Sequence, residues 1–227
     1  MKTQIRYEDE HLLIVYKPAG LATQNANIRV PDMESELKKY LHGNFVGIVH
    51  RLDQPVEGLL VVAKNSTIAG LLSRELSRGN LGKEYTAAVL GPFLPEELAN
   101  ANNVYLQKIK KTKEGLSAIV PDSDPEGKQA HTCFSVDAYS ILSEHIPINR
   151  VSIHLKTGRF HQIRCQFAAN GHPLLGDQKY GNPEVNQILP GCHVALCANR
   201  IHLTHPITKK ELYYEQAPQN EIFKLFE

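Results

Sequence analysis

The alternation of apolar and polar residues predicts short strands along the whole chain. Residues 11–16 (HLLIVY), which are apolar after His11, end at a Lys-Pro-Ala-Gly turn, and this pattern is typical of a buried strand. Residues 132–139 and 149–155 alternate between apolar and polar side chains, as half-buried strands do. We expect strands at 11–16, 47–49, 59–63, 84–90, 116–120, 132–139, 149–155, 194–198 and 200–204.

Helical spacing appears in three places between these strands. Met33, Leu37 and Leu41 repeat every four residues after Asp32, which can cap a helix. A second helix is expected from Asn65 or Ser66 to Gly79, and a third at 161–170. Residues 92–130 are expected to be irregular, with one short strand. Because strands and helices intermingle without regular βαβ alternation, the pattern favours a mixed α+β fold over a doubly wound sheet.

Composition is that of a globular protein. The chain has 227 residues, 42% of them hydrophobic and 22% charged. Its longest apolar run, Leu59–Ala63, is too short to cross a bilayer, and the acidic residues 8–10 stand where a signal peptide would be apolar. The four cysteines form no CxxC pair. We therefore expect a reducing, cytoplasmic compartment and no membrane partner.

Charge is unevenly distributed although the formal net charge is only +1. Residues 150–210 carry eight Lys and Arg against two acidic residues, and six of the eleven histidines. A chance fluctuation over solvated faces explains this asymmetry as simply as a localised nucleic-acid site does.

His50-Arg51-Leu52-Asp53 is the first candidate for chemistry. It follows a short strand and precedes a loop that contains Gly58. A strand end beside a glycine loop fixes a side chain while admitting a ligand. A structural Arg–Asp pair that closes a turn is the alternative.

Residues 157–164, with the sequence TGRFHQIR, are the second candidate. A glycine turn enters a helix there, and a helix N-terminus can bind phosphate. Arg159, His161 and Gln162 place hydrogen-bonding side chains at that end. Arg164 lies next to Ile163; if it is drawn inward it needs a carboxylate partner, for which Asp53 is a candidate. An amphipathic helix with a polar face explains the segment equally well.

Other kinds of site have weaker signals. The pairs His131–Cys133 and Cys192–His193, with Cys197, lack the spacing of a dependable zinc site, so no metal is expected. Asp53 and Glu57 could form the carboxylate pair of a glycosidase-like hydrolase, but Glu57 is expected in a loop that does not fix their distance. No P-loop, GxGxxG or GxSxG motif is present.

Taken in order, five segments resemble the RluA-type RNA pseudouridine synthases. The matches cover most of the chain, and their combination is far more specific than any one of them. They are Lys17–Leu21 (KPAGL), His50–Asp53 with Gly58–Leu60 and Ala63-Lys64, Lys83–Tyr85 (KEY), Thr157–Arg164 with Gly171–Pro173, Gly176-Asp177 and Tyr180-Gly181, and Leu203–Pro206 (LTHP).

The sequence departs from this family pattern at a few positions. Val56 and Glu57 replace small hydroxyl residues, Phe160 stands where threonine is common, and Gln166 where histidine is frequent. An S4-like RNA-binding domain is not expected, because residue 17 already belongs to the catalytic part. We expect one catalytic domain over residues 1–227, with two sheet-based halves, flanking helices, a largely antiparallel sheet and a central active-site cleft.

The resemblance implies an isomerisation of uridine to pseudouridine that needs no cofactor and no metal. It implies that Asp53 is the catalytic carboxylate, as a nucleophile or as a base at C2′. Arg164 would pair with Asp53 and keep it ionised, and Tyr85 would pack on the uracil. Arg51 would fill the space left by the flipped base. The substrate-binding residues would be Arg51, Leu52, Arg159, His161, Gln162 and Ile163.

The resemblance also implies the partner. We expect the chain to act as a monomer on structured tRNA or rRNA, and not on DNA. A catalytically silent RNA-binding protein on the same fold is the alternative, because Val56 and Glu57 depart from the family pattern. A hydrolase that acts on a nucleoside through a carboxylate pair is a weaker possibility.

Overall fold

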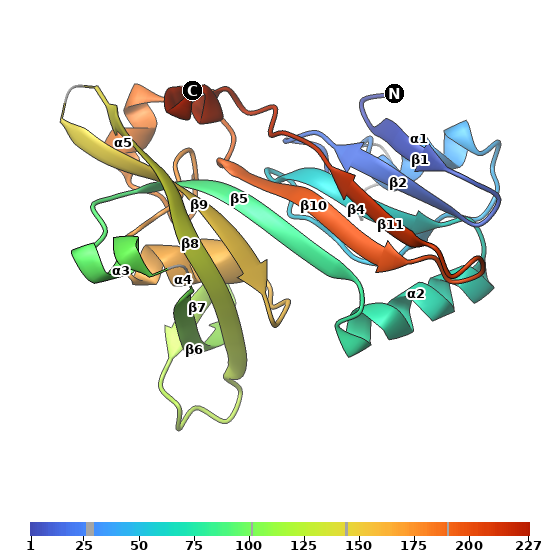
Figure 1. Cartoon of the computed structure of the whole chain (residues 1–227), viewed down its shortest axis with the longest axis horizontal. Helices are drawn as coiled ribbons and strands as arrows, with labels where there is room; N and C mark the ends of the chain where they lie inside the picture. The colour runs from blue at the N-terminus through green and yellow to red at the C-terminus, as the bar shows by residue number, and fades with distance from the viewer. Residues whose placement is uncertain (26–29, 101, 144, 190) are drawn as a thin grey trace. The chain divides into compact units, whose positions relative to one another are not determined.

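The chain divides into two compact units in a computed structural model that describes residues 1–25, 30–100, 102–143, 145–189 and 191–227 (Figure 1). The first unit comprises Met1–Lys83 and Cys197–Gln219, and the second comprises Glu84–Leu196 and Asn220–Glu227. Each unit combines a mostly antiparallel sheet with a few helices, so the expected α+β class is confirmed. Among the residues described, no helix is both long enough and apolar enough to span a membrane.

The sheet of the first unit has the strand order β1-β2-β4-β10, with β3 beside β4 and β11 beside β10. The pairing of β4 with β10 is parallel and the other pairings are antiparallel. The strands are β1 (Gln4–Glu8), β2 (Leu12–Lys17), β3 (Gly47–Ile48), β4 (Glu57–Ala63), β10 (Leu196–Thr204) and β11 (Glu211–Glu215).

Two helices complete the first unit. Asp32 caps α1 (Met33–Tyr40) by accepting the Ser35 N–H at 2.7 Å. Asn65 caps α2 (Ser66–Arg78) in the same way, and Gly79 ends it in a left-handed conformation. Both helices therefore begin where the sequence predicts them.

The core of the first unit lies around β2 and β4, all of whose residues are buried. Ile68 and Leu72 of α2 belong to the same apolar cluster. At the start of β4, Gly58 has a φ of 136°, and a Cβ there would lie 2.5 Å from the Ala198 backbone nitrogen. Only glycine lets β4 approach β10 this closely.

In the second unit the strands lie in the order β5-β9-β8-β6-β7, and each neighbouring pair is antiparallel. Its helices are α3, α4, α5 and the 3₁₀ helix η1. The bounds are β5 (Gly82–Leu90), α3 (Pro95–Ala99), β6 (Asn103–Lys111), β7 (Ser117–Val120), β8 (Lys128–Leu142), β9 (Ile146–Leu155), α4 (Gln162–Ala169), α5 (Pro183–Ile188) and η1 (Glu221–Phe226).

Aromatic rings fill part of the second unit's core. Phe134 of β8, Phe167 of α4 and Tyr105 of β6 have ring centroids 4.7 to 5.1 Å apart, at tilted or edge-to-face angles. Phe167 is fully buried. These contacts fix α4, which carries much of the second candidate segment, on the sheet.

The prediction of an irregular segment at 92–130 is wrong apart from its one short strand, because the strand expected at 116–120 is β7. This segment contains α3, the long strand β6, β7 and the start of β8. Polar residues dominate β6, and only residues such as Tyr105 and Ile109 turn inward. The strand is stabilised by pairing with β8, in which the paired residues are 19 to 31 positions apart, and local sequence does not reveal such pairing.

Strand ends were also misplaced. The predicted loop at 54–58 ends earlier, because Glu57 and Gly58 pair with Cys197 and Ala198 and extend β4. The two strands expected at 194–198 and 200–204 form the single strand β10, and the 47–49 strand is reduced to Gly47–Ile48. The strands β1 and β11 and the helix α5 were not predicted.

Candidate functional site

The loop that carries Asp53 lies in the first unit, between β3 and β4. Its backbone is held at Leu52 and Asp53, the last two residues of the HRLD segment. Thr23 Oγ1 donates to the Leu52 carbonyl at 2.9 Å and accepts the Leu52 N–H at 3.2 Å. The Val56 N–H donates to the Asp53 carbonyl at 3.0 Å, which closes a turn after Asp53. Leu52 is buried, Arg51 is exposed and Asp53 is half-buried, so the loop presents a carboxylate from a fixed backbone.

Lys17, the last residue of β2, anchors this loop through its side chain. Its side chain is fully buried, and its Nζ donates to the carbonyls of Leu21 at 2.6 Å, Pro18 at 3.1 Å and Gln54 at 3.2 Å. One ammonium therefore joins the 17–21 turn to the residue next to Asp53. Burial lowers the pKa of Lys17 to about 8, although the carboxylates of Asp53 and Glu57 act in the opposite direction.

His50 connects the loop to β4. Its Nε2 accepts the Val61 N–H at 3.3 Å, so this nitrogen carries no proton. Burial holds the pKa of His50 well below its usual range, and the nearby Lys83 ammonium lowers it further. His50 therefore stays uncharged at physiological pH, as a structural residue of the loop.

Glu57 is committed to internal contacts. Its side chain is 2% exposed, and its Oε1 accepts the Gln219 N–H at 2.9 Å. The Tyr16 hydroxyl also hydrogen-bonds to it. A carboxylate held this way is poorly placed to activate water, which disfavours the pairing of Asp53 and Glu57 in a hydrolase.

Arg164, on α4 of the second unit, forms a buried bidentate ion pair with Asp177. Arg164 Nε lies 2.7 Å from Asp177 Oδ2, and Nη2 lies 2.7 Å from Oδ1. The two side chains are 3% and 0% exposed. Such a pair fixes the plane of the guanidinium and uses two of its five N–H groups.

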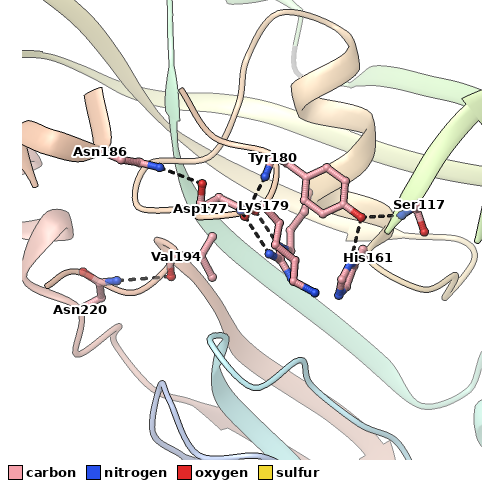
Figure 2. A network of polar contacts seen from close by, with 9 residues as sticks. Ser117, His161, Asp177, Lys179, Tyr180, Asn186, Val194 and Asn220 are labelled. Carbon is pink, nitrogen blue, oxygen red and sulfur yellow. Dashed lines mark hydrogen bonds and ion pairs between the residues drawn. The ribbon is translucent and has the colours of Figure 1, made fainter. Parts of the chain in front are cut away.

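The backbone around Asp177 completes this arrangement. The N–H groups of Lys179 and Tyr180 donate to its Oδ1 at 2.9 and 3.1 Å (Figure 2). Burial alone would raise the pKa of Asp177, but the hydrogen bonds and charge of Arg164, together with these N–H groups, outweigh burial and lower it. Asp177 is thus ionised at neutral pH and holds Arg164 in its charged form.

Tyr180 links the ion pair to the loop before α4. Its hydroxyl accepts the Ser117 N–H at 2.6 Å and lies 2.8 Å from His161 Nδ1 (Figure 2). The Arg164 Cζ lies 5.2 Å from the centroid of the Tyr180 ring. His161 precedes α4 in a left-handed conformation, with φ of 50°, so the helix begins at Gln162 rather than at 161 as expected.

The other residues expected to bind substrate are also in defined positions. Gln162 is buried, and its side chain contacts Thr157 Oγ1, Thr132 Oγ1, the Arg159 N–H and the His131 carbonyl. These contacts fix the 157–159 loop, and a substrate contact by Gln162 remains a prediction. Arg159 is exposed, with its Nε donating to the Gln129 carbonyl at 3.0 Å.

Tyr85 and Ile163 are both buried in the second unit. Tyr85 is 6% exposed on β5, where it pairs with Ile153 of β9. Ile163 is 4% exposed on α4. The packing of Tyr85 on the uracil and the substrate contact of Ile163 stay predictions, and ordinary core packing explains the burial of Ile163 equally well.

Sequence reasoning named Asp53 as the partner of Arg164 and did not recognise Asp177 in that role. The Gly176-Asp177 pair was visible only as part of the family motif. An Arg164–Asp53 pair would join the two units, and it remains a prediction. Lys17 was likewise seen only as part of a turn, although its place beside an apolar run is a signal of burial. Nothing in the sequence points to Ser117.

Metal ligands do not cluster in the part of the chain that the structure describes. No group of three or more His, Cys, Asp or Glu side chains there is placed to hold an ion. The cysteines at 133, 165, 192 and 197 are free thiols.

Known proteins are similar to this chain in sequence and in fold. Residues 11–169 match the family model described as RNA pseudouridylate synthase, a range that includes Asp53, Tyr85 and Arg164. The ribosomal large subunit pseudouridine synthase C of Rickettsia prowazekii is 36% identical over 216 residues, which cover 92% of this chain and 66% of that protein. An RNA pseudouridine synthase of Bacillus subtilis, YhcT, is 34% identical over 94% of this chain and 68% of its own length.

The solved structures agree in fold. The human protein called RNA pseudouridylate synthase domain containing 1 superposes with a TM-score of 0.78 at 22% identity, over 95% of this chain and 83% of that one. The chain spans about two thirds of the length of the two bacterial relatives (66% and 68%). On the strength of the family model and these relatives, the chain belongs to the RNA pseudouridylate synthase family, whose members are isomerases that convert uridine to pseudouridine in RNA.

Proposed function

We propose that this protein isomerises specific uridines of a structured tRNA or rRNA to pseudouridine, with Asp53 as the catalytic carboxylate. In this reaction the N1–C1′ bond breaks, the uracil turns, and C5 bonds to C1′, while C5 loses its proton and N1 takes one up. The atoms of substrate and product are the same, so no oxidant or group donor is required. The proposal rests above all on the family match, which includes the loop of Asp53.

The proposal gives each candidate residue a role. Asp53 acts on the ribose or the uracil as nucleophile or base, which requires the ionised form. Arg164 favours that form through its charge, Tyr85 packs on the uracil, and Arg51 occupies the space of the flipped base.

Recognition of RNA would fall to the exposed basic residues and to the polar residues that precede α4. Arg51 and Arg159 are exposed. Structured RNA is read mainly through shape, phosphates and unpaired bases, which suits a few cations beside a pocket. The name of the Rickettsia prowazekii relative refers to the large ribosomal subunit, which supports including rRNA among the substrates proposed here.

Pseudouridine mapping in cells tests this function. Cells that lack the protein are expected to lose pseudouridine at one or a few positions of tRNA or rRNA, and the wild-type gene restores them. A gene carrying Asp53→Asn serves as the matched control and is expected to restore none. Unchanged pseudouridine in every RNA, together with RNA binding by the purified protein, would favour the catalytically silent RNA-binding alternative. Free uracil as the product would favour a hydrolase.

The buried Lys17 predicts an unusual pH dependence. Raising the pH through about 8 removes the Lys17 charge in the folded protein, whereas an unfolded lysine keeps its proton to about pH 10.5. The unfolded state therefore binds more protons between these values, and this residue makes unfolding less favourable as the pH rises, by up to about 3 kcal/mol. Catalysis is expected to fall over the same range, because the ammonium anchors the Asp53 loop.

Urea unfolding and initial rates, both measured from pH 7 to 10, check this prediction. The expected result is a declining rate with a midpoint near pH 8. Lys17→Met lacks the titrating group and is expected to show a smaller increase of unfolding free energy with pH than the wild type. Equal pH slopes in the two proteins would show that Lys17 does not titrate in this range.

A further inference from the structure

Three aromatic rings connect the buried ion pair of the second unit to an exposed lysine. The Arg164 Cζ lies 5.2 Å from the Tyr180 ring, and the rings of Tyr180 and His161 meet edge to face at 5.5 Å. His161 stacks on Phe160 at 3.8 Å with an interplanar angle of 22°. Lys111 Nζ lies 4.8 Å from the Phe160 centroid. The row ends at the surface, where Phe160 is 42% exposed.

The backbone that carries Phe160 is held in place although its ring is exposed. Ser117 Oγ donates to the Phe160 carbonyl at 2.6 Å, and the Arg159 N–H donates to Gln162 Oε1 at 2.9 Å. Ser117 also contacts Tyr180, so one residue of β7 fixes two members of the row. An exposed ring on a fixed backbone loses little conformational entropy when a ligand packs on it.

The surroundings of this ring are positively charged. Lys111, Lys113 and Arg159 are exposed beside it or in the adjoining 112–116 turn, against one acidic residue of that turn, Glu114. Lys110, on the same strand as Lys111, differs because Asp124 and Glu126 pair with it. When a base stacks on the face of the ring, a solvent-exposed lysine there can leave the ring and bind a neighbouring phosphate instead.

We propose that Phe160 is a stacking platform for an unpaired base of the bound RNA, with Lys111 and Arg159 contacting the flanking phosphates. The identity of the ligand as RNA rests on the proposed function. Fixed aromatic side chains beside cations bind single-stranded nucleic acid with little sequence preference, since every base has a π-face. The platform would thus hold one nucleotide of the bound RNA and would contribute affinity rather than chemistry.

The absence of tryptophan from the sequence makes a direct test possible. Phe160→Trp introduces a single fluorophore at the platform, and titration with an oligouridine of about 12 nucleotides is expected to quench its emission by stacking. Tyr139→Trp, at a residue of β8 that is 61% exposed, is the matched control and is expected to keep its emission. A fully paired RNA of the same length offers no unstacked base and is expected to quench neither variant.

Affinity gives a second measurement. Phe160→Ala is expected to weaken binding of the same fluorescein-labelled oligouridine by about 5- to 150-fold, the range found when one stacking ring is removed. Phe160→Tyr keeps the ring and is expected to bind as the wild type does. Urea unfolding of each variant shows whether the fold is intact. A structural role for Phe160 would lower stability in Phe160→Ala and leave the affinity of the folded protein unchanged.

The outcomes separate this inference from the proposed function. Binding without quenching in Phe160→Trp, wild-type affinity in a folded Phe160→Ala, or no binding of the oligouridine by the wild type would each overturn the platform. Pseudouridine formation by the wild type, measured in parallel, is independent of these results. An active enzyme without quenching refutes only the platform, and quenching without activity supports the platform while refuting the enzyme proposal.

Discussion

Asp53→Asn is expected to bind RNA and form no detectable pseudouridine. The substitution keeps the size of the side chain but removes its negative charge, and with it the nucleophile or base of the proposed reaction. Loss of such a group lowers rates by about 10²- to 10⁴-fold or more. The measurement is the single-turnover rate of tritium release from RNA labelled at uridine C5.

Folding provides the control for this variant. Asp53 is half-buried, and asparagine keeps the size of its side chain. Urea unfolding of the variant beside the wild type shows whether it is folded before the rates are compared. A folded Asp53→Asn protein that releases tritium at the wild-type rate would exclude Asp53 as the catalytic residue.

Asp177→Asn is expected to destabilise the second unit strongly. The substitution removes the carboxylate charge from the bidentate pair with the buried Arg164 guanidinium, and breaking a buried pair in this way costs about 3–5 kcal/mol. Urea unfolding measures the loss. Because the pKa of Asp177 is lowered in the folded protein, the same stabilisation is present above the ordinary carboxyl pKa and is lost as the pH falls through the lowered value.

Two variants show whether the ion pair is responsible. The double variant Arg164→Met with Asp177→Leu replaces both charges with apolar groups and is expected to recover most of the stability, but no activity. Glu34→Gln removes one partner of a partly exposed ion pair with Lys38 and is expected to change the midpoint far less than Asp177→Asn. A double variant as unstable as Asp177→Asn would show that packing, rather than charge, dominates at this site.

The elements predicted correctly are those whose signals are local. Asp32 and Asn65 mark the helix starts of α1 and α2, and a continuous apolar run marks β2, because capping and burial act within a few residues. The errors are elements that depend on distant partners. The polar strand β6 requires β8, and the first residues of β4 require β10.

In the candidate site, too, local signals were visible in the sequence and long-range contacts were not. The sequence identified the segments that carry Asp53 and Arg164, since each departs from the apolar pattern around it. It did not identify the groups that hold them. Lys17 reaches Gln54 across 37 positions, and Ser117 reaches Tyr180 across 63. Such contacts are products of tertiary structure.

The basic residues of the segment 150–210 have different surroundings in the structure. The segment is divided between the two units, and the charge of Arg164 within it is matched by Asp177. Arg200 pairs with Glu215 on β11. Arg159 remains exposed in the second unit, close to Lys111 and Phe160. RNA that binds to Arg159 and Lys111 through a few phosphates is expected to show an affinity that depends only modestly on salt concentration.

The measurement that tests the central claim most directly is the product balance of the purified wild-type protein. RNA from cells that lack the protein, labelled with tritium at uridine C5, is incubated with it, and released tritium, pseudouridine and free uracil are quantified together. The account predicts equal amounts of released tritium and new pseudouridine, with no free uracil. Absence of tritium release from this RNA, or release accompanied by free uracil instead of pseudouridine, would contradict it.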